Sequence, residues 1–333
     1  MAKIAVIGLS GQSIFMHLDD FPIPSVTTHV KSYYEEPGGK GYNQAVACNK
    51  LGCNVSYLSR IGNDYYGKYC KEYMESLDIK TFFIKDLEEK FLNSKIDMIV
   101  SLDGGCTVIE MIDKVDYDMI NKNKKIFTGF SDLTHLQIAM YTKSKLPSLY
   151  GMDIINGFGN NNEFTQKNIN SFFNIINNKE EKIENYDKVK VLKEGNATGT
   201  LVGGWLTAIA DLIETEYWPD DENVILFFEE VECEPHLINI NLQRIKLSKK
   251  MKNIKGIVIG DFTDCEEKEY WDCIPTIEDI ILNTFKEYNI PIISNMSFGH
   301  GDKHLTIPIG IKAEINSEWN YIKLLEKFKL GGK

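Results

Sequence analysis

The sequence predicts an α/β protein, with a layered N-terminal domain around a mainly parallel sheet and a smaller, strand-rich C-terminal domain. Two observations support this fold class. Over the first 150 residues, short apolar runs typical of buried strands alternate with amphipathic runs typical of helices. Beyond residue 190 the pattern changes to apolar strands separated by glycine-rich turns. Strands that alternate with helices imply a parallel sheet covered on both faces, and 333 residues suffice for two domains.

The first 85 residues are expected to form one α/β layer. Apolar, β-branched runs predict its strands, and runs with apolar residues at helical spacing predict its helices. The expected strands are residues 2–7, 27–34, 54–60 and 80–84, and the expected helices are residues 41–51 and 65–77.

A second α/β series is expected at residues 86–155, followed by a polar connection at 156–190 and a C-terminal domain at 191–333. The connection is rich in Asn, Lys and Glu and has little apolar periodicity. In the second series, strands are expected at 96–101 and 125–129 and helices at 107–120 and 133–142; later strands are expected at 189–192, 224–228, 256–259 and 291–294.

Composition excludes several classes of partner. A net charge of −11 without a basic stripe argues against nucleic acid and against anionic membranes. No apolar run approaches the roughly 18 residues that span a bilayer, and the N-terminus lacks the features of a signal peptide. Seven cysteines, an odd number, lie at irregular spacing without a CxxC pair, which favours neither a zinc site nor a thioredoxin-like motif. A reducing cytoplasm is the expected location.

Three segments far apart in the chain are candidates for one hydrolytic site. Ser131 lies between a strand-like and a helix-like run, where a sharp turn would expose its hydroxyl beside a helix N-terminus. A serine needs a base such as His300, which a carboxylate such as Glu229 would orient. Spacing alone favours a simpler interpretation: a serine at a helix N-cap, a strand ending in acids, and a surface histidine in a turn.

Seven motifs, taken in their order along the chain, favour the hydrolytic site over the simpler interpretation. They are IVSLDGG at 99–105, VDYD at 115–118, FTGFSDLT at 127–134, GTLVGG at 199–204, ILFFEE at 225–230, FGHG at 298–301 and IPIG at 307–310. With these motifs, the chain from about residue 87 onward resembles the peptidase S66 family, which contains the murein LD-carboxypeptidases and the microcin C immunity peptidases. Each motif alone is weak, but their joint order is specific.

The resemblance implies a role for each candidate. Ser131 would be the nucleophile, His300 the general base and then acid, and Glu229 the group that orients His300. The backbone N–H groups of Gly105 and Asp132 would form the oxyanion hole. The resemblance also implies a small peptide or peptide-conjugate substrate, a homodimer, and no metal or organic cofactor.

The strand that carries Glu229 also predicts where its neighbour points. Because successive side chains of a strand alternate between faces, Glu230 is expected on the opposite face and in solvent.

Three positions depart from the family pattern. Trp205 replaces an asparagine after the glycine pair, Cys106 replaces an aromatic residue, and Ile240 stands where the family has an arginine. These departures bear on substrate identity more than on the triad. The substrate carboxylate needs a cation, for which Lys303 and Arg244 are candidates by residue type alone.

Residues 3–84 resemble a different family, the ribokinase-like (PfkB) sugar kinases. The resemblance rests on GGKGYNQA at 38–45 and RIGND at 60–64. It implies sugar contacts by Gly38, Gly39, Lys40 and Asn43. The late catalytic motif of these kinases is missing, and there is no Walker-type loop, so kinase activity is not expected. The chain is therefore interpreted as a chimera joined near residues 84–90, whose N-terminal segment completes an α/β layer.

The favoured function is a serine carboxypeptidase that acts on muropeptides. One alternative is hydrolysis of a peptide–nucleotide amide, as in the microcin C immunity peptidases. Those enzymes carry a tryptophan in the region of the connection, and residues 156–193 contain none, which favours the muropeptide. The other alternative is a catalytically inert chimera with residual sugar binding.

Overall fold

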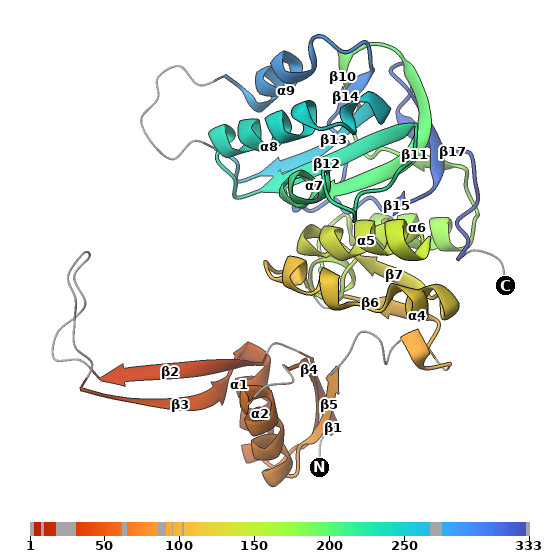
Figure 1. Ribbon diagram of the computed structural model, residues 1–333. Helices are drawn as coiled ribbons and strands as arrows, with labels where there is room; N and C mark the ends of the chain where they lie inside the picture. Colours follow the sequence, from red (N-terminus) through yellow and green to blue (C-terminus); the bar gives the residue numbers. More distant parts are fainter. Residues whose placement is uncertain are drawn as a thin grey trace. The chain divides into compact units, whose positions relative to one another are not determined.

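The computed structural model divides the chain into two compact units, Met1–Glu89 and Lys90–Lys333 (Figure 1). Each unit is described by itself. The described residues are 3–7, 10–17, 31–61, 65–84, 91–94, 96–101, 103–266 and 275–330.

The first unit is built on a parallel sheet in the order β1-β4-β5, with a separate antiparallel pair formed by β2 and β3. Apolar side chains of two helices and the sheet strands pack together in its core, among them Tyr42, Tyr57 and Met74. The elements are β1 (Lys3–Ile7), β2 (Gly11–His17), β3 (Ser32–Gly38), α1 (Lys40–Lys50), β4 (Asn54–Arg60), α2 (Tyr65–Ser76) and β5 (Lys80–Ile84).

Two differences from the sequence prediction concern the antiparallel pair. Strand β2 was not predicted, and the strand predicted at 27–34 begins only at Ser32; residues 27–30 lie outside the described part. β1 pairs with β4 inside this unit. That residues 1–85 complete a layer for the rest of the chain remains a prediction.

The predicted sugar-binding residues lie where β3 turns into α1. Gly38 is buried at the end of β3, Gly39 precedes the helix with a φ of 102°, and Asn43 is exposed in the first turn. A Cβ at Gly38 would lie 2.2 Å from Oγ of Ser13, so the close approach of β2 requires glycine there. The side chain of Lys40 lies outside the described part.

The second unit contains a four-stranded sheet in the order β15-β8-β7-β6. β6, β7 and β8 are parallel, and β15 joins antiparallel. These strands are β6 (Met98–Val100), β7 (Ile126–Gly129), β8 (Ser148–Tyr150) and β15 (Ile307–Ile309), and the helices near them are α4 (Tyr117–Lys122) and α5 (Thr134–Ser144).

The helix predicted at 107–120 is wrong for most of its length. Two short 3-10 turns, Val108–Glu110 and Ile112–Lys114, precede α4. The chain becomes extended at Val115, and the side chain of Asp116 then accepts the N–H of Met119 at 2.9 Å and begins a new helix. An N-cap inside the predicted helix therefore divides it.

The larger sheet has eight strands in the order β10-β14-β13-β12-β11-β16-β17-β9. Its four central strands are parallel and its outer strands antiparallel, so the sheets are mixed, within an α/β fold whose C-terminal region is rich in strands. The strands are β9 (Lys182–Glu184), β10 (Lys190–Lys193), β11 (Asn196–Trp205), β12 (Val224–Val231), β13 (Ile254–Thr263), β14 (Ile292–Ser294), β16 (Lys312–Asn316) and β17 (Tyr321–Leu324).

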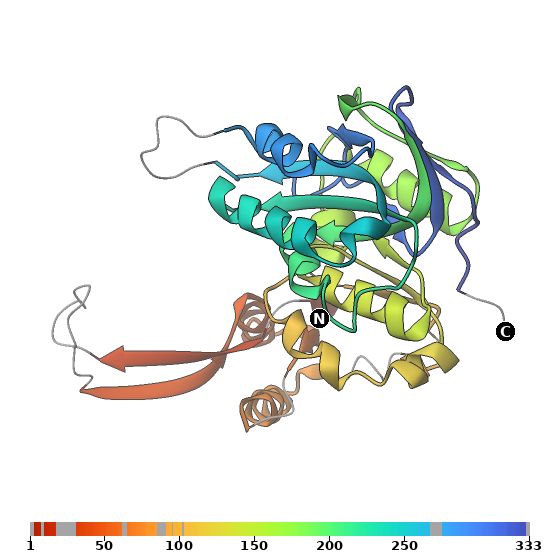
Figure 2. The ribbon, with the colours of Figure 1, turned by 45° about the horizontal axis from the view of Figure 1, so that its top comes forward.

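Helices cover this sheet. α7 (Leu206–Leu212), α8 (Pro235–Leu247) and α9 (Ile277–Phe285) lie side by side along one face, as Figures 1 and 2 show. The stretch expected as a connection begins within a π-helical turn (Ile154–Phe158) and contains α6 (Thr165–Ile176) and β9. It contributes Phe172, Ile175 and Ile183 to the core.

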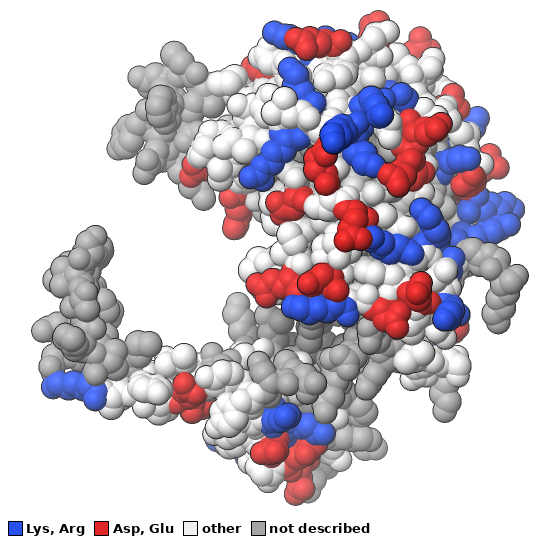
Figure 3. Space-filling view, viewed as in Figure 1, with Lys and Arg blue, Asp and Glu red and all other residues white. Residues whose placement is uncertain are grey.

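The face in Figure 3 carries acidic and basic side chains interspersed over the described residues, without a continuous patch of one sign. Among those residues, no helix has the length and apolar character needed to cross a bilayer. No cluster of three or more His, Cys, Asp or Glu side chains in the described ranges is arranged to hold a metal ion.

Candidate active site

Ser131 lies at a strained turn between β7 and α5. β7 ends at Gly129, and Ser131 begins a 3-10 turn that leads into the helix. Its φ of 60° lies in the left-handed region, which is costly for a residue with a side chain. The buried phenol oxygen of Tyr150 accepts the N–H of Ser131 at 3.3 Å. A side chain of the neighbouring strand β8 therefore hydrogen-bonds to the backbone of this turn.

The loop Asp103–Gly105 packs directly against this turn. A Cβ at Gly104 would lie 2.9 Å from Cβ of Ser131, so only glycine allows the loop to approach so closely. The N–H of Gly105 has no acceptor among the described residues. The N–H of Asp132 lies in the first turn of a helix, where no acceptor within the helix exists. The two predicted oxyanion donors therefore lie on adjoining segments.

The carboxylate of Asp132 joins the two segments. Its Oδ2 accepts the N–H groups of Thr107 at 2.8 Å and Val108 at 3.0 Å, and its Oδ1 contacts Nδ1 of His135 at 2.9 Å. Burial works against both charges, but the mutual hydrogen bonds lower the pKa of Asp132 and, with Asp211, raise that of His135 to about 9. A buried ion pair thus underlies the serine turn.

Glu229 and His300 are in direct contact. Glu229 lies near the end of β12 with no exposed surface, and its Oε2 is 2.7 Å from Nδ1 of His300. Its other oxygen, Oε1, accepts a hydrogen bond from the hydroxyl of Tyr150 at 2.6 Å. Tyr150 therefore connects the carboxylate to the backbone of Ser131. Burial, and then the charge of Glu229, raises the pKa of Tyr150 well above 10, so the phenol stays protonated.

The ring of His300 is fixed on two sides. Burial alone would lower its pKa, but the hydrogen bond to Glu229 and the charge of that carboxylate raise it above 6.5. The ring of Phe130 lies 4.8 Å from it, centroid to centroid. Within the described part, no hydrogen bond joins Oγ of Ser131 to His300, so the structure brings together two of the three predicted triad side chains by hydrogen bonding.

A cavity of about 280 Å³ opens beside His300. Its walls come from the residue before the serine turn, from the loop after β8 and from the segment that carries His300. They are formed by Phe130, Asn156, Asn160, His300, Gly301, Asp302 and His304. A substrate group next to the imidazole would occupy this space.

The expectation that Glu230 is solvated is wrong. Glu230 has no exposed surface and accepts hydrogen bonds from the indole of Trp205, from both N–H and hydroxyl of Thr207, and from the N–H of Val231. β12 is buried on both faces, because helices cover the side that the alternation assigned to solvent. Trp205 is thereby anchored to Glu230 and does not line the cavity beside His300.

The two cations considered for the substrate carboxylate have acidic partners. Lys303 pairs with Asp187, and Arg244 lies 3.8 Å from Asp211 on the exposed side of α8. Neither lines the cavity. Cys106 is exposed beside Gly105, and Ile240 is exposed on α8.

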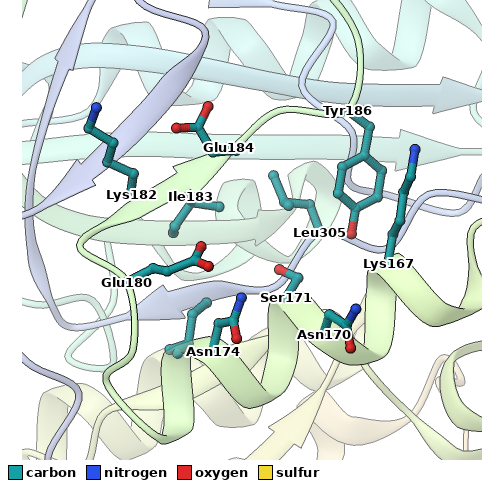
Figure 4. Close-up of a pocket in the computed structure, with 11 residues that line it drawn as sticks. Lys167, Asn170, Ser171, Asn174, Glu180, Lys182, Ile183, Glu184, Tyr186 and Leu305 are labelled. Atoms are coloured by element: carbon teal, nitrogen blue, oxygen red, sulfur yellow. The ribbon is translucent and has the colours of Figure 1, made fainter.

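A second, smaller cavity of about 180 Å³ lies between α6 and β9 (Figure 4). Ser171 and Asn174 line it from the helix, Ile183 lines it from the strand, and Tyr186 lines it from the segment after β9. It contains none of the predicted site residues.

Two of the residues that organise the site were not found from the sequence. His135 had a signal, since it follows Asp132 at helical spacing and can reach it. Tyr150 had none, because only the register of β7 and β8, which places Gly129 opposite Tyr150, brings it under the serine turn.

Comparisons with known proteins bear on both parts of the chain. Family models match at residues 40–151, as an LD-carboxypeptidase N-terminal domain, and at residues 198–315, as an LD-carboxypeptidase C-terminal domain. The probable murein peptide carboxypeptidase of Bacillus subtilis is 26% identical over 242 residues, which are 70% of this chain and 73% of that protein. Ribokinase of Bacillus subtilis is 32% identical over 85 residues, which are 26% of this chain and 29% of the kinase.

Solved structures share the fold. Muramoyltetrapeptide carboxypeptidase from Oxalobacter formigenes matches with a TM-score of 0.63 and 24% identity, over 76% of this chain and 92% of that one. The microcin C7 self-immunity protein MccF, in complex with aspartyl sulfamoyl adenosine, matches with a TM-score of 0.65 and 20% identity, over 77% of this chain and 89% of that one.

Proposed function

The chain belongs to the peptidase S66 family of LD-carboxypeptidases, and from this premise we propose that it is a serine carboxypeptidase. It would hydrolyse an amide near the C-terminus of a small peptide through an acyl-enzyme on Ser131. The observation that carries the proposal is the contact of Glu229 with His300 at 2.7 Å, linked through Tyr150 to the backbone of Ser131.

In the proposed reaction, Oγ of Ser131 attacks the carbonyl carbon of the scissile amide while Nε2 of His300 takes the hydroxyl proton. Glu229 holds Nδ1 of the imidazole, so that Nε2 faces the serine, and it stabilises the imidazolium that forms. The imidazolium then gives its proton to the leaving amine. A water molecule attacks the acyl-enzyme in the same way and releases the shortened peptide.

The oxyanion of each tetrahedral intermediate would be stabilised by the N–H groups of Gly105 and Asp132. Main-chain donors of this kind typically contribute about 3 kcal/mol each to lowering the barrier. Their positions are supported by the close packing at Gly104 and by the hydrogen bonds that Asp132 makes to Thr107 and Val108. Because these contacts exist before substrate binds, little reorganisation is needed during the reaction.

The proposed substrate is a muropeptide with a terminal D-amino acid. The likeness to the murein peptide carboxypeptidase supports it, as does the lack of tryptophan in residues 156–193. The test is hydrolysis of a muramoyl tetrapeptide, followed by mass spectrometry, with Ser131→Ala as the control. Release of terminal D-alanine by the parent alone supports the proposal. If neither protein releases it, the proposal for this substrate fails, and an aspartyl–nucleotide conjugate is the substrate to test next.

We also propose that residues 1–85 are a ribokinase-like segment joined to the peptidase. The ribokinase match and the segment's own sheet and core support this. If the segment retains sugar binding, ribose raises the melting temperature of the parent, and Asn43→Ala removes the shift. A shift that survives in Asn43→Ala would contradict a site at this turn.

Finally, we propose a homodimer in the cytoplasm. The family resemblance supports the dimer, and the six free cysteines in the described part of the chain fit a reducing compartment. Sedimentation equilibrium tests the first proposal, and a sedimenting monomer at micromolar concentration would contradict it.

A further inference from the structure

His304 is buried, and its imidazole has no hydrogen-bond partner in the part of the chain that the structure describes. The residue is 2% exposed, its Nδ1 is buried, and neither ring nitrogen forms a hydrogen bond with another described residue. Its position is nevertheless fixed, because its backbone N–H donates to Oδ1 of Asn168 at 3.0 Å and its ring packs edge-on against Phe130 at 5.4 Å. An unsatisfied buried polar group costs about 1–3 kcal/mol, so its retention needs an explanation.

His304 is one of the residues that line the cavity beside His300. Burial, together with the charge of His300, lowers the pKa of His304 to about 4. The imidazole is therefore neutral near pH 7, with one nitrogen that donates and one that accepts. Because Nδ1 is enclosed by the protein, Nε2 is the ring nitrogen that a ligand in the cavity can contact.

The two asparagines of the cavity have opposite free groups. Nδ2 of Asn156 donates to Asp103 and Asp153, each at 3.1 Å, so its carbonyl oxygen remains as an acceptor. Oδ1 of Asn160 accepts the N–H of Asn161 at 2.8 Å, so its NH₂ group remains as a donor. The cavity thus offers a neutral donor and a neutral acceptor from separate side chains.

The only charge among the lining residues other than His300 is negative. Asp302 receives a hydrogen bond from Asn162 at 3.0 Å, and no Lys or Arg lines the cavity. A carboxylate in this space would face Asp302 and the carbonyl of Asn156, neither of which can donate. An ammonium group could donate to Asp302 and to the carbonyl of Asn156, but it would leave the NH₂ group of Asn160 without an acceptor. A carboxamide has both a donor and an acceptor, and it meets both requirements.

We propose that this cavity is a specificity pocket for a carboxamide side chain next to the scissile amide, and that His304 is a specificity-determining residue. The inference rests on the proposed peptidase function and specifies its substrate class. It distinguishes glutamine from glutamate, which have the same size and differ in charge and in donors. A site that hydrogen-bonds its substrate rejects analogues that leave its buried groups unpaired.

The test compares peptides that carry Gln, Glu or Lys, in turn, at each residue flanking the scissile bond. At one flanking position, kcat/KM for Gln should exceed that for Glu and Lys by about tenfold or more. The ratio of two substrates on one protein sample is independent of the fraction that is folded. His304→Phe keeps the aromatic packing and should reduce the ratio severalfold, whereas the matched change His236→Phe, on the exposed part of α8, should leave it unchanged.

Three results would overturn the inference. They are a Gln-to-Glu ratio near one at both positions, a preference for Lys, and a ratio that survives in His304→Phe. If no peptide is hydrolysed, the proposed function fails separately, and calorimetry of the same peptides with Ser131→Ala decides the inference. Tighter binding of the Gln peptide supports the pocket, and equal or absent binding of all three overturns it.

Discussion

Glu229 and Glu230 are neighbours on β12, and both are completely buried, yet their surroundings differ in kind. Glu229 faces a phenol and an imidazole, and beyond the imidazole lies a cavity. Glu230 faces an indole, a threonine and a backbone amide, and it lines no part of that cavity. Burial raises the pKa of Glu230, and the charge of Glu229 adds to this shift. The hydrogen bonds that Glu230 accepts oppose it.

The comparison shows that a buried, fully hydrogen-bonded carboxylate does not by itself mark an active site. The donors around Glu230 keep their protons at any physiological pH, so they cannot exchange protons with a substrate. The hydrogen bonds of Glu230 therefore serve to hold the end of β12 in place. The imidazole of His300, whose pKa Glu229 holds above 6.5, is a group that can accept and donate a proton, so the side of Glu229 can support catalysis. The following predictions separate the two sides.

The largest effect is expected on the side of Glu229, at the proposed nucleophile and base. Ser131→Ala and His300→Ala should each lower kcat by about 10⁴-fold or more, and the double variant should lose little more, because a triad acts as a unit. Steady-state kinetics with circular dichroism as a folding control measures this. Losses that multiply in the double variant would mean that the two residues work independently.

Glu229→Gln should lower kcat by about 10²–10⁴-fold, since an amide no longer stabilises the imidazolium. It should also move the acidic limb of kcat/KM against pH. His300 must be neutral to accept a proton, so activity falls as the pH drops through its pKa, which Glu229 holds above 6.5. Without that charge, burial lowers the pKa, and the limb moves to lower pH. An unchanged limb would assign it to another group.

Tyr150→Phe should lower kcat by about 10–100-fold, with a smaller change in KM. The substitution removes the hydroxyl that donates to Glu229 at 2.6 Å and accepts from Ser131 at 3.3 Å, so both lose a positioning contact while the ring remains. Tyr117→Phe is the matched control, because the hydroxyl of Tyr117 donates to the backbone carbonyl of Ile112 and not to Glu229. Equal kinetics of the two variants would show that the bridge is not needed.

Glu230→Gln should reverse the pattern and affect stability more than rate. The amide NH₂ would replace one oxygen that now accepts hydrogen bonds, so the donors that face it would lose their acceptor. The free energy of unfolding should therefore fall by about 1–3 kcal/mol. kcat should stay within a few fold of the parent. Denaturant unfolding and kinetics on the same preparation test this, and a large loss of kcat in the folded variant would refute the division between the two faces.

The smallest effect is expected for Trp205→Phe. It removes one hydrogen bond to Glu230 and keeps most of the apolar contact, so unfolding should become easier by about 1 kcal/mol. Activity should be unchanged, because Trp205 does not line the cavity. A changed substrate preference in this variant would show that the indole reaches the substrate after all.

Local sequence patterns predicted the elements whose conformation is determined by their own residues and the turns that flank them. The strands at 54–60 and 80–84 have the predicted bounds, since short runs that contain β-branched and aromatic residues between turns indicate a strand without tertiary information. The run 107–120 has enough apolar residues for a helix, but the cap at Asp116 competes with it. The strand β2, with polar and apolar residues mixed, gains its conformation from pairing with β3.

For the site, the motifs indicated Ser131, Glu229 and His300, whose roles stay predictions. The residues that contact these three could not be predicted, because the register of the strands and the packing of helices on the sheet bring them together. The misplacement of Glu230 is instructive. The run that precedes it, residues 224–228, is apolar at every position, which is typical of a strand buried on both faces. Alternation alone was therefore the wrong guide at the end of that run.

The carboxylate of Asp132 has a consequence for hydrogen exchange. Thr107 lies in an exposed part of its loop, yet its amide proton and that of Val108 are bound to Asp132 beneath the serine turn. These two amides can exchange with deuterium only when the loop separates from the turn. Their protection therefore reports how often the two halves of the oxyanion hole come apart in the resting protein, without any substrate present.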